Sequence, residues 1–184
     1  QHQLRVTAHT NHLEDALEVL EAGCDGLEHG VMRTRLQDEK LATLLKERKA
    51  SYAPTLSLYQ AGRTESEQDL DRLAMAMANL KQLADSGVRI VLGTDTLSRG
   101  TPPGSTTLKE LELMVRAGLS PEQAIQAATR NAAEHLGKLD ELGTLEPGKL
   151  ADLIIVDGDP LMDISVIHNI EVVVKGGKIV ADHR

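Results

Sequence analysis

Short apolar runs typical of strands alternate with amphipathic helix patterns four times between residues 4 and 118 of this chain. This alternation limits the possible folds more strongly than any other feature. The expected strands cover residues 4–9, 25–29, 50–56 and 88–95, and the expected helices cover residues 12–22, 37–48, 67–86 and 107–117. Strands that alternate with helices pair in parallel through right-handed crossovers, so the chain is predicted to be an α/β protein.

Helix-start signals support these boundaries and add two more helices after Gly118. A capping box pairs a small polar residue with Glu or Gln three positions later. The chain offers four such pairs: Asn11 with Glu14, Thr107 with Glu110, Ser120 with Gln123, and Asn131 with Glu134. Each pair predicts the first turn of a helix.

The number of strand and helix units suggests part of a larger architecture. A closed (β/α)8 barrel has eight units in about 250 residues. Four units in this 184-residue chain predict half of such a barrel, and we assign residues 1–138 to it, with its trailing helices. Residues 139–184 form a β-strand tail, with strands expected at 150–156, 170–175 and 178–181 and a hairpin turn at Gly176-Gly177.

Charge and composition exclude several classes of partner. The net charge is -8, from 20 Lys and Arg against 28 Asp and Glu, so neither nucleic acid nor an anionic membrane surface is an expected partner. The sequence has no apolar run of bilayer length and no signal-peptide pattern at its start, and we expect a cytoplasmic protein. The single cysteine, Cys24, fits a reducing compartment and should be a small buried hydrophobe.

Three of the four expected strands end in a residue that can bind or activate a metal: His9, His29 and Asp95. In a barrel, the carboxyl ends of the strands converge on one mouth, so distant residues can meet there. Neutral imidazole is a common zinc ligand, and a carboxylate can complete the shell or accept a proton from water. One such histidine alone could simply cap backbone groups, but three residues at equivalent positions favour a metal site.

These residues and their neighbours resemble a known family. His9 within 6–10, His29 within 28–30 and Asp95 within 93–96 are similar to the fifth-strand His, sixth-strand His and eighth-strand Asp of the amidohydrolase superfamily. The closest resemblance is to its imidazolonepropionase-like and dipeptidase-like branch. Residues 142–161 independently resemble that family's return from barrel to side domain, and residues 174–180 resemble its closing hairpin.

The resemblance implies the C-terminal half of a metal-dependent hydrolase (β/α)8 TIM barrel, followed by the C-terminal part of a small β-sandwich side domain. It also implies hydrolysis of carbon–nitrogen bonds, in amides, peptide-like compounds or non-aromatic ring amides, by metal-activated water. His9 and His29 would bind a divalent ion, most simply zinc. Asp95 would ligate the metal or lie close to it, take the proton of the attacking water and return it to the leaving group.

The chain also departs from the family's pattern. Family members carry a His-x-His pair on the first strand, and many carry a carboxylated lysine or a glutamate on the fourth. This sequence starts at what matches the fifth strand, contains no His-x-His, opens with Gln1 and has no methionine before Met32. We therefore expect a fragment with an incomplete metal shell and low or absent activity by itself.

Two other functions stay open: a non-catalytic half-barrel module that acts through oligomerisation, and a related metal-dependent esterase or lactonase. Half a barrel leaves unpaired edge strands and an uncovered apolar face, so we expect a homo-oligomer or association with the missing N-terminal half. His12 and Thr96 are further candidates for contact with a small-molecule substrate. His135, His168 and His183 are interpreted as structural or surface residues.

Overall fold

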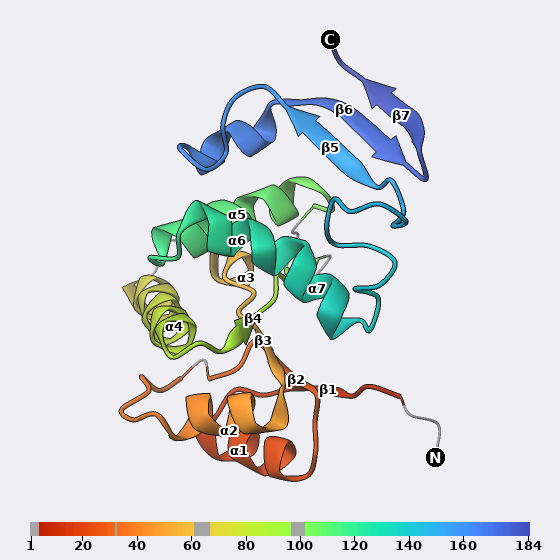
Figure 1. Cartoon of the computed structure of the whole chain (residues 1–184). Helices are drawn as coiled ribbons and strands as arrows, with labels where there is room; N and C mark the ends of the chain where they lie inside the picture. Colours follow the sequence, from red (N-terminus) through yellow and green to blue (C-terminus); the bar gives the residue numbers. More distant parts are fainter. Residues whose placement is uncertain (1–3, 32, 61–66, 97–101) are drawn as a thin grey trace.

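The computed structural model of the chain describes residues 4–31, 33–60, 67–96 and 102–184. Its helices are α1 (Leu13–Glu21), α2 (Lys40–Arg48), α3 (Ser57–Gln60), α4 (Glu67–Asp85), α5 (Ser105–Arg116), α6 (Pro121–Ala128), α7 (Arg130–His135) and the 3₁₀ helix η2 (Ile164–His168). Its strands are β1 (Thr7–His9), β2 (Gly26–Glu28), β3 (Ser51–Ala53), β4 (Arg89–Ile90), β5 (Leu153–Val156), β6 (Ile170–Lys175) and β7 (Lys178–Asp182). Helices α5 and α6 lie between two separate sheets (Figure 1).

Strands β1 to β4 form the first sheet, in the order of the sequence and with every neighbouring pair parallel. Gly26 of β2 lies in register between Thr7 of β1 and Ser51 of β3. These strands are therefore not shifted relative to one another, and their carboxyl ends lie at one edge of the sheet. This arrangement confirms the α/β prediction.

One face of this sheet supplies the core. Leu27, Tyr52 and Ile90 lie in register across β2, β3 and β4, and each is at most 5% exposed. They join a single apolar cluster with residues of the surrounding helices, including Leu20 of α1, Leu45 of α2, Leu80 of α4 and Leu113 of α5. Because successive strand residues point to opposite faces, Glu28 and Arg89 belong to the other face of the sheet.

The fourth strand is shorter than the sequence predicts. The amide of Val91 still donates to the carbonyl of Tyr52 on β3, but the next amide, that of Leu92, donates to the carbonyl of Ala127 at the end of α6. The backbone therefore leaves the ladder after Val91. The prediction of a strand over 88–95 is wrong beyond Ile90, because the amide of Leu92 binds the end of α6 and not β3.

One of the four expected capping boxes is confirmed. The Oγ of Ser120 accepts from the amide of Gln123 at 3.1 Å, and the side chain of Gln123 accepts from the amide of Ser120 at 2.8 Å. Pro121 occupies the first turn of α6, where its missing donor costs nothing.

The other three capping boxes are wrong. Helices α1, α5 and α7 begin after His12, Gly104 and Thr129, none of which makes a side-chain cap. Two of the expected glutamates have other partners: Glu110 is buried and accepts from backbone amides of another segment, and Glu134 pairs with Arg89 at 2.6 Å. Tertiary contacts thus override the local pattern.

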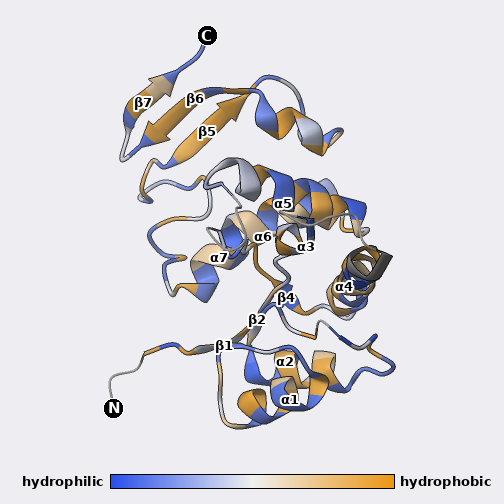
Figure 2. Cartoon of the chain, turned by 180° about the vertical axis from the view of Figure 1, so that it is seen from behind, coloured by the Kyte–Doolittle hydropathy of each residue, from blue (hydrophilic) through white to orange (hydrophobic). Residues whose placement is uncertain are grey.

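The second sheet is antiparallel, in the order β5-β6-β7. Lys175 pairs with Lys178 across Gly176-Gly177, which confirms the expected hairpin turn. Helix η2, which the sequence did not predict, buries Ile164 and Ile167 in the core that includes α5. Figure 2 shows that β5 and β6 are largely apolar, and Ile154 and Ile155 remain almost half exposed, at 45% and 46%. The division of the chain at residue 138 stays a prediction.

Two further expectations concern single properties of the chain. Cys24 is buried, as predicted for a small hydrophobe. Among the residues that the structure describes, no helix combines the length and apolar character needed to cross a membrane.

Candidate functional site

His29 stands directly after β2, in a backbone conformation that non-glycine residues rarely adopt. Its φ is 65°, and Gly30 follows with a φ of 67°. The amide of His29 donates to the carbonyl of Ala53 at 3.0 Å, and the hydroxyl of Tyr52 donates to the carbonyl of His29 at 3.4 Å. Burial raises the pKa of Tyr52, so this hydroxyl stays protonated as a donor. Contacts with β3 therefore hold the turn that presents His29.

His29 is 8% exposed, and its Nδ1 lies 2.7 Å from the Oγ1 of Thr55. Burial, followed by the neighbouring His9, lowers the pKa of His29, against the opposing effect of the Asp95 and Glu28 carboxylates. A lowered pKa favours the neutral ring, the form that binds metals. A neutral ring that donates its Nδ1–H to a hydroxyl keeps the Nε2 lone pair free for a ligand.

His9 ends the neighbouring strand β1 and faces His29. The two ring centroids are 4.6 Å apart, with an edge-on angle of 70° between the ring planes. The side-chain amide of Asn11 donates to the Nε2 of His9 at 2.9 Å. His9 is otherwise exposed. The structure thus brings together two of the three residues that the sequence predicted for a metal site.

Asp95, the third predicted residue, is exposed and has a left-handed φ of 49°. The charge of Asp95 acts to raise the pKa of His29, against the larger lowering effect of burial. Over the described ranges 4–31, 33–60, 67–96 and 102–184, no three His, Cys, Asp or Glu side chains are grouped so that they could hold a metal ion. The roles of His9, His29 and Asp95 as metal-site residues, and of Asp95 as a catalytic residue, stay predictions.

The two candidate substrate contacts lie near this edge of the sheet. His12 is the residue before α1 and is exposed. The hydroxyl of Thr96 pairs with that of Thr94, next to Asp95. Their role as substrate contacts stays a prediction.

Sequence analysis missed Thr55, which contacts His29 directly. Thr55 follows β3, is 2% exposed and has a φ of 45°. It lies within the one expected strand, residues 50–56, to which no chemical role was given. Thr55 lies two residues beyond the end of β3 and His29 one residue beyond the end of β2, so both stand at the carboxyl edge of the sheet, where the strand-end argument looks for functional residues.

Glu110 of α5 was interpreted as part of a capping box, and its observed environment is different. The side chain is fully buried, and its two carboxylate oxygens accept from the amides of Leu56 and Ser57. Burial raises the pKa of Glu110 to about 7, although the two backbone hydrogen bonds oppose this shift. Glu110 therefore holds the segment that follows Thr55.

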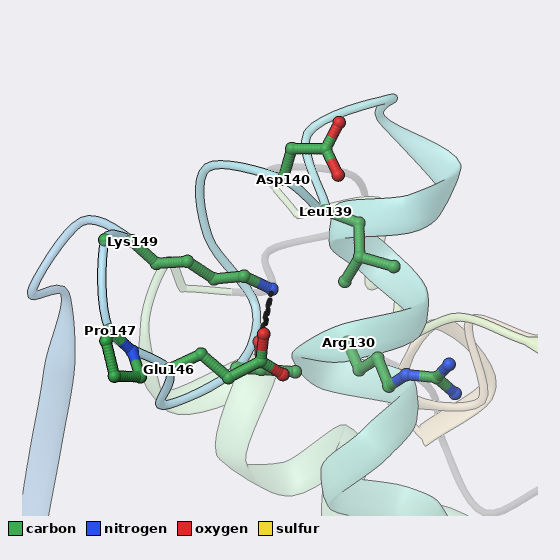
Figure 3. Close-up of a pocket in the computed structure, with 8 residues that line it drawn as sticks. Arg130, Leu139, Asp140, Glu146, Pro147 and Lys149 are labelled. Atoms are coloured by element: carbon green, nitrogen blue, oxygen red, sulfur yellow. Dashed lines mark hydrogen bonds and ion pairs between the residues drawn. The ribbon is translucent and has the colours of Figure 1, made fainter.

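A surface pocket of about 420 Å³ lies between α7 and the loop that follows it (Figure 3). Its lining includes Arg130, Asp140, Glu146 and Lys149, and the Nζ of Lys149 lies 3.3 Å from a carboxylate oxygen of Glu146. The lining holds two cationic and two anionic side chains, so the pocket has no excess of either charge. None of the candidate metal-site residues lines it.

The chain is thus an α/β protein in which two neighbouring imidazoles form a candidate metal centre at the carboxyl edge of a parallel sheet. The chain belongs to the Amidohydrolase family, whose sequence profile matches residues 1–180. This membership confirms the family resemblance.

Individual relatives agree with this assignment. Ochratoxinase of Aspergillus niger is 35% identical over 190 residues, which cover 95% of this chain and 37% of ochratoxinase. Imidazolonepropionase of Geobacillus kaustophilus (strain HTA426) is 37% identical over 108 residues, which cover 57% of this chain and 26% of that protein.

Solved structures show the same fold. A Xaa-Pro dipeptidase with bound methionine superimposes with a TM-score of 0.79 at 32% identity, over 96% of this chain and 44% of that one. The crystal structure of A. niger ochratoxinase gives a TM-score of 0.81 at 32% identity, over 97% of this chain and 42% of that one. The chain therefore spans less than half the length of these relatives.

Proposed function

We propose that this chain forms part of a metal-dependent hydrolase that cleaves carbon–nitrogen bonds in amide or peptide-like small molecules. The observation that carries the proposal is the pair of imidazoles, His9 and His29, at the carboxyl edge of the sheet, with the second ring held by Thr55. Relatives named imidazolonepropionase and Xaa-Pro dipeptidase support an amide or a peptide-like substrate.

The side chains fit part of a metal shell. The Nε2 of His29 has no hydrogen bond among the described residues, and its Nδ1 lies within hydrogen-bond distance of the Thr55 hydroxyl, a polar partner that can orient the ring for ligation. His9 lies beside it, and the Asp95 charge acts on His29. Zinc, with nitrogen and oxygen ligands, suits this donor set. Because no three donors are grouped among the residues that the structure describes, we infer that the remaining ligands come from outside these ranges.

The chain's own groups have distinct roles in this proposal. His9 and His29 would hold a divalent ion, which would supply a water molecule of lowered pKa and polarise the substrate carbonyl. Asp95 takes a proton from the attacking water and returns it to the leaving nitrogen, as its exposed position at the strand edge allows. His12 and Thr96, near the same edge, contact the substrate.

We further propose that the β1 to β4 sheet is half of a (β/α)8 TIM barrel and that residues 139–184 belong to a composite β-sandwich side domain. The fraction of each relative that the chain covers supports both proposals. The almost half-exposed Ile154 and Ile155 of β5 also support the composite side domain, because such apolar side chains need a cover. The cover is the N-terminal half of the protein or a second copy of this chain.

A non-catalytic module that acts through oligomerisation is the second candidate. The absence of a three-donor group among the described residues favours it. A metal-dependent esterase or lactonase would use the same groups on an oxygen ester.

The test is a metal analysis of chain purified without chelator, followed by an assay with a Xaa-Pro dipeptide and added zinc. We expect bound divalent metal and little or no turnover by the chain alone, with turnover restored by the N-terminal half of a relative. Ordinary turnover by the chain alone would contradict the incomplete shell. A preparation without zinc, iron, manganese or nickel would favour the non-catalytic module.

A further inference from the structure

Glu110 connects helix α5 to the segment beside His29. One carboxylate oxygen accepts from the amide of Leu56 at 2.7 Å, and the other accepts from the amide of Ser57 at 2.6 Å. Amides at the start of a helix have no partner within the helix, so an acceptor from outside is needed. Because two oxygens of one rigid group bind two successive amides, Glu110 fixes both the position and the orientation of this turn.

The turn carries Thr55 in a strained conformation. Its φ of 45° lies in the left-handed region, which is costly for a β-branched residue and persists only where the surroundings enforce it. The amide of Leu58 closes the turn by donating to the carbonyl of Thr55 at 3.1 Å. In this conformation the Oγ1 of Thr55 lies 2.7 Å from the Nδ1 of His29.

A helix cap alone does not account for a buried carboxylate at this place. Helix α6 is capped by Ser120, a neutral and exposed side chain, at the start of an eight-residue helix. Helix α3 has four residues, and its acceptor is a fully buried Glu110 from another helix. Burial of a carboxylate is costly even when it is hydrogen-bonded. We attribute this cost to the placement of Thr55, because the buried carboxylate binds the two amides that follow it.

We infer that Glu110 is a positioning residue for the candidate metal centre, which acts through the Thr55 turn to hold the imidazole of His29 with its Nε2 free. The inference rests on the proposed function, because it assumes that His29 binds a metal. Glu110 itself lies behind the turn and does not touch the reacting groups. Its effect passes from α5 to residues 55–57 and from there to the end of β2.

The experiment compares Glu110→Gln and Glu110→Asp in the full chain. Gln keeps one acceptor oxygen and places an NH2 group against the second amide, and Asp keeps the charge but shortens the reach. Glu112→Gln is the matched control, since Glu112 lies on the same helix and pairs with Lys109 and His168 instead. Thr55→Ser, which keeps the hydroxyl, and Thr55→Val, which removes it, define the two limits for the His29 contact.

Two quantities are measured in each variant. Long-range ¹H–¹⁵N NMR of the metal-free chain reports which nitrogen of His29 carries the proton, and calorimetric titration with zinc chloride gives the affinity. We expect the Nδ1–H tautomer in the wild type and in Glu112→Gln. In Glu110→Gln and Thr55→Val we expect a mixture of tautomers and a zinc affinity at least about 10-fold weaker, the usual effect of losing an outer-shell partner.

A folded Glu110→Gln or Glu110→Asp chain with wild-type His29 tautomer and zinc affinity would overturn the inference. Loss of the fold in both variants would also overturn it, because Glu110 would then serve stability and not positioning. If the wild type binds no zinc, the proposed function fails. The tautomer comparison in the metal-free chain would still decide the role of Glu110, so the two failures are distinguishable.

Discussion

The Nδ1 atom of His29 lies 2.7 Å from the Oγ1 atom of Thr55, and this hydrogen bond joins the ends of strands β2 and β3. Both residues have left-handed backbones, with φ values of 65° and 45°. Such conformations cluster at functional sites, where the surrounding structure enforces them. The pair therefore marks this edge of the sheet as a place where backbone strain accompanies a defined side-chain geometry.

Removal of the Thr55 hydroxyl should weaken metal binding without unfolding the chain. Thr55→Val keeps the shape of the side chain but leaves the Nδ1 of His29 without its partner. We expect zinc affinity to fall by about 10- to 100-fold, and Thr55→Ser to stay near the wild type. Competition with a chromogenic zinc chelator measures both. Equal affinities for Val and Ser would show that the hydroxyl has no role in holding the ring.

The turn after His29 should not tolerate a side chain at Gly30. A Cβ there would lie 2.0 Å from the ring of Tyr52, and the φ of 67° adds backbone strain. We expect Gly30→Ala to lower the free energy of unfolding by roughly 2–4 kcal/mol, from strain and overpacking together. Urea denaturation measures this loss.

Gly23→Ala is the matched control for Gly30→Ala. Gly23 has a φ of 98°, but a Cβ at this position meets no atom within 4 Å. The expected loss is therefore about 1 kcal/mol, from backbone strain alone. Similar losses at both positions would mean that the Tyr52 ring moves aside at little cost.

Glu110 should make the stability of the chain depend on pH. Its pKa rises from 4.5 to about 7 in the folded state, so the folded chain binds this proton more tightly than the unfolded chain does. The resulting stabilisation is fully present below pH 4.5 and is lost as pH rises towards 7. We expect Glu110→Gln to remove this loss, which is measured by denaturant unfolding at several pH values.

Glu112→Gln should change the pH dependence in the opposite direction. The hydrogen bond with Lys109 is the largest of the causes that lower the pKa of Glu112. The stabilisation that Glu112 contributes is therefore present above the ordinary pKa of 4.5 and disappears as pH falls below it. The Gln variant should therefore lose stability near neutral pH and little in acid.

A Glu110→Gln profile parallel to that of the wild type between pH 4.5 and 7 would contradict the assignment of the loss of stability in this pH range to Glu110.

Sequence patterns predicted the features that depend on local chemistry and strand alternation. The α/β alternation, the Ser120 capping box and the Gly176-Gly177 hairpin are confirmed, because each follows from backbone preferences that neighbouring residues already satisfy. The proximity of His9 and His29 followed from the rule that parallel strands end at one edge.

Features that depend on distant contacts could not be predicted in this way. Glu110 and Glu134 stand at capping-box spacing, but they bind Leu56, Ser57 and Arg89, which come from other elements. Such pairs leave no mark in the local sequence. Thr55 is different, because it lies near the carboxyl end of an expected strand, but threonine is common in strands and its residue type did not suggest a role in a metal site.

Binding of zinc by His9 and His29 is the central claim, and a calorimetric titration of the chain with zinc chloride tests it most directly. The comparison is between the wild type, the double variant His9→Ala/His29→Ala and the control His183→Ala, which removes an exposed imidazole near the end of the chain. We expect one zinc site in the wild type and in the control, and an affinity at least about 100-fold weaker in the double variant. Equal zinc affinity in all three proteins would contradict the claim.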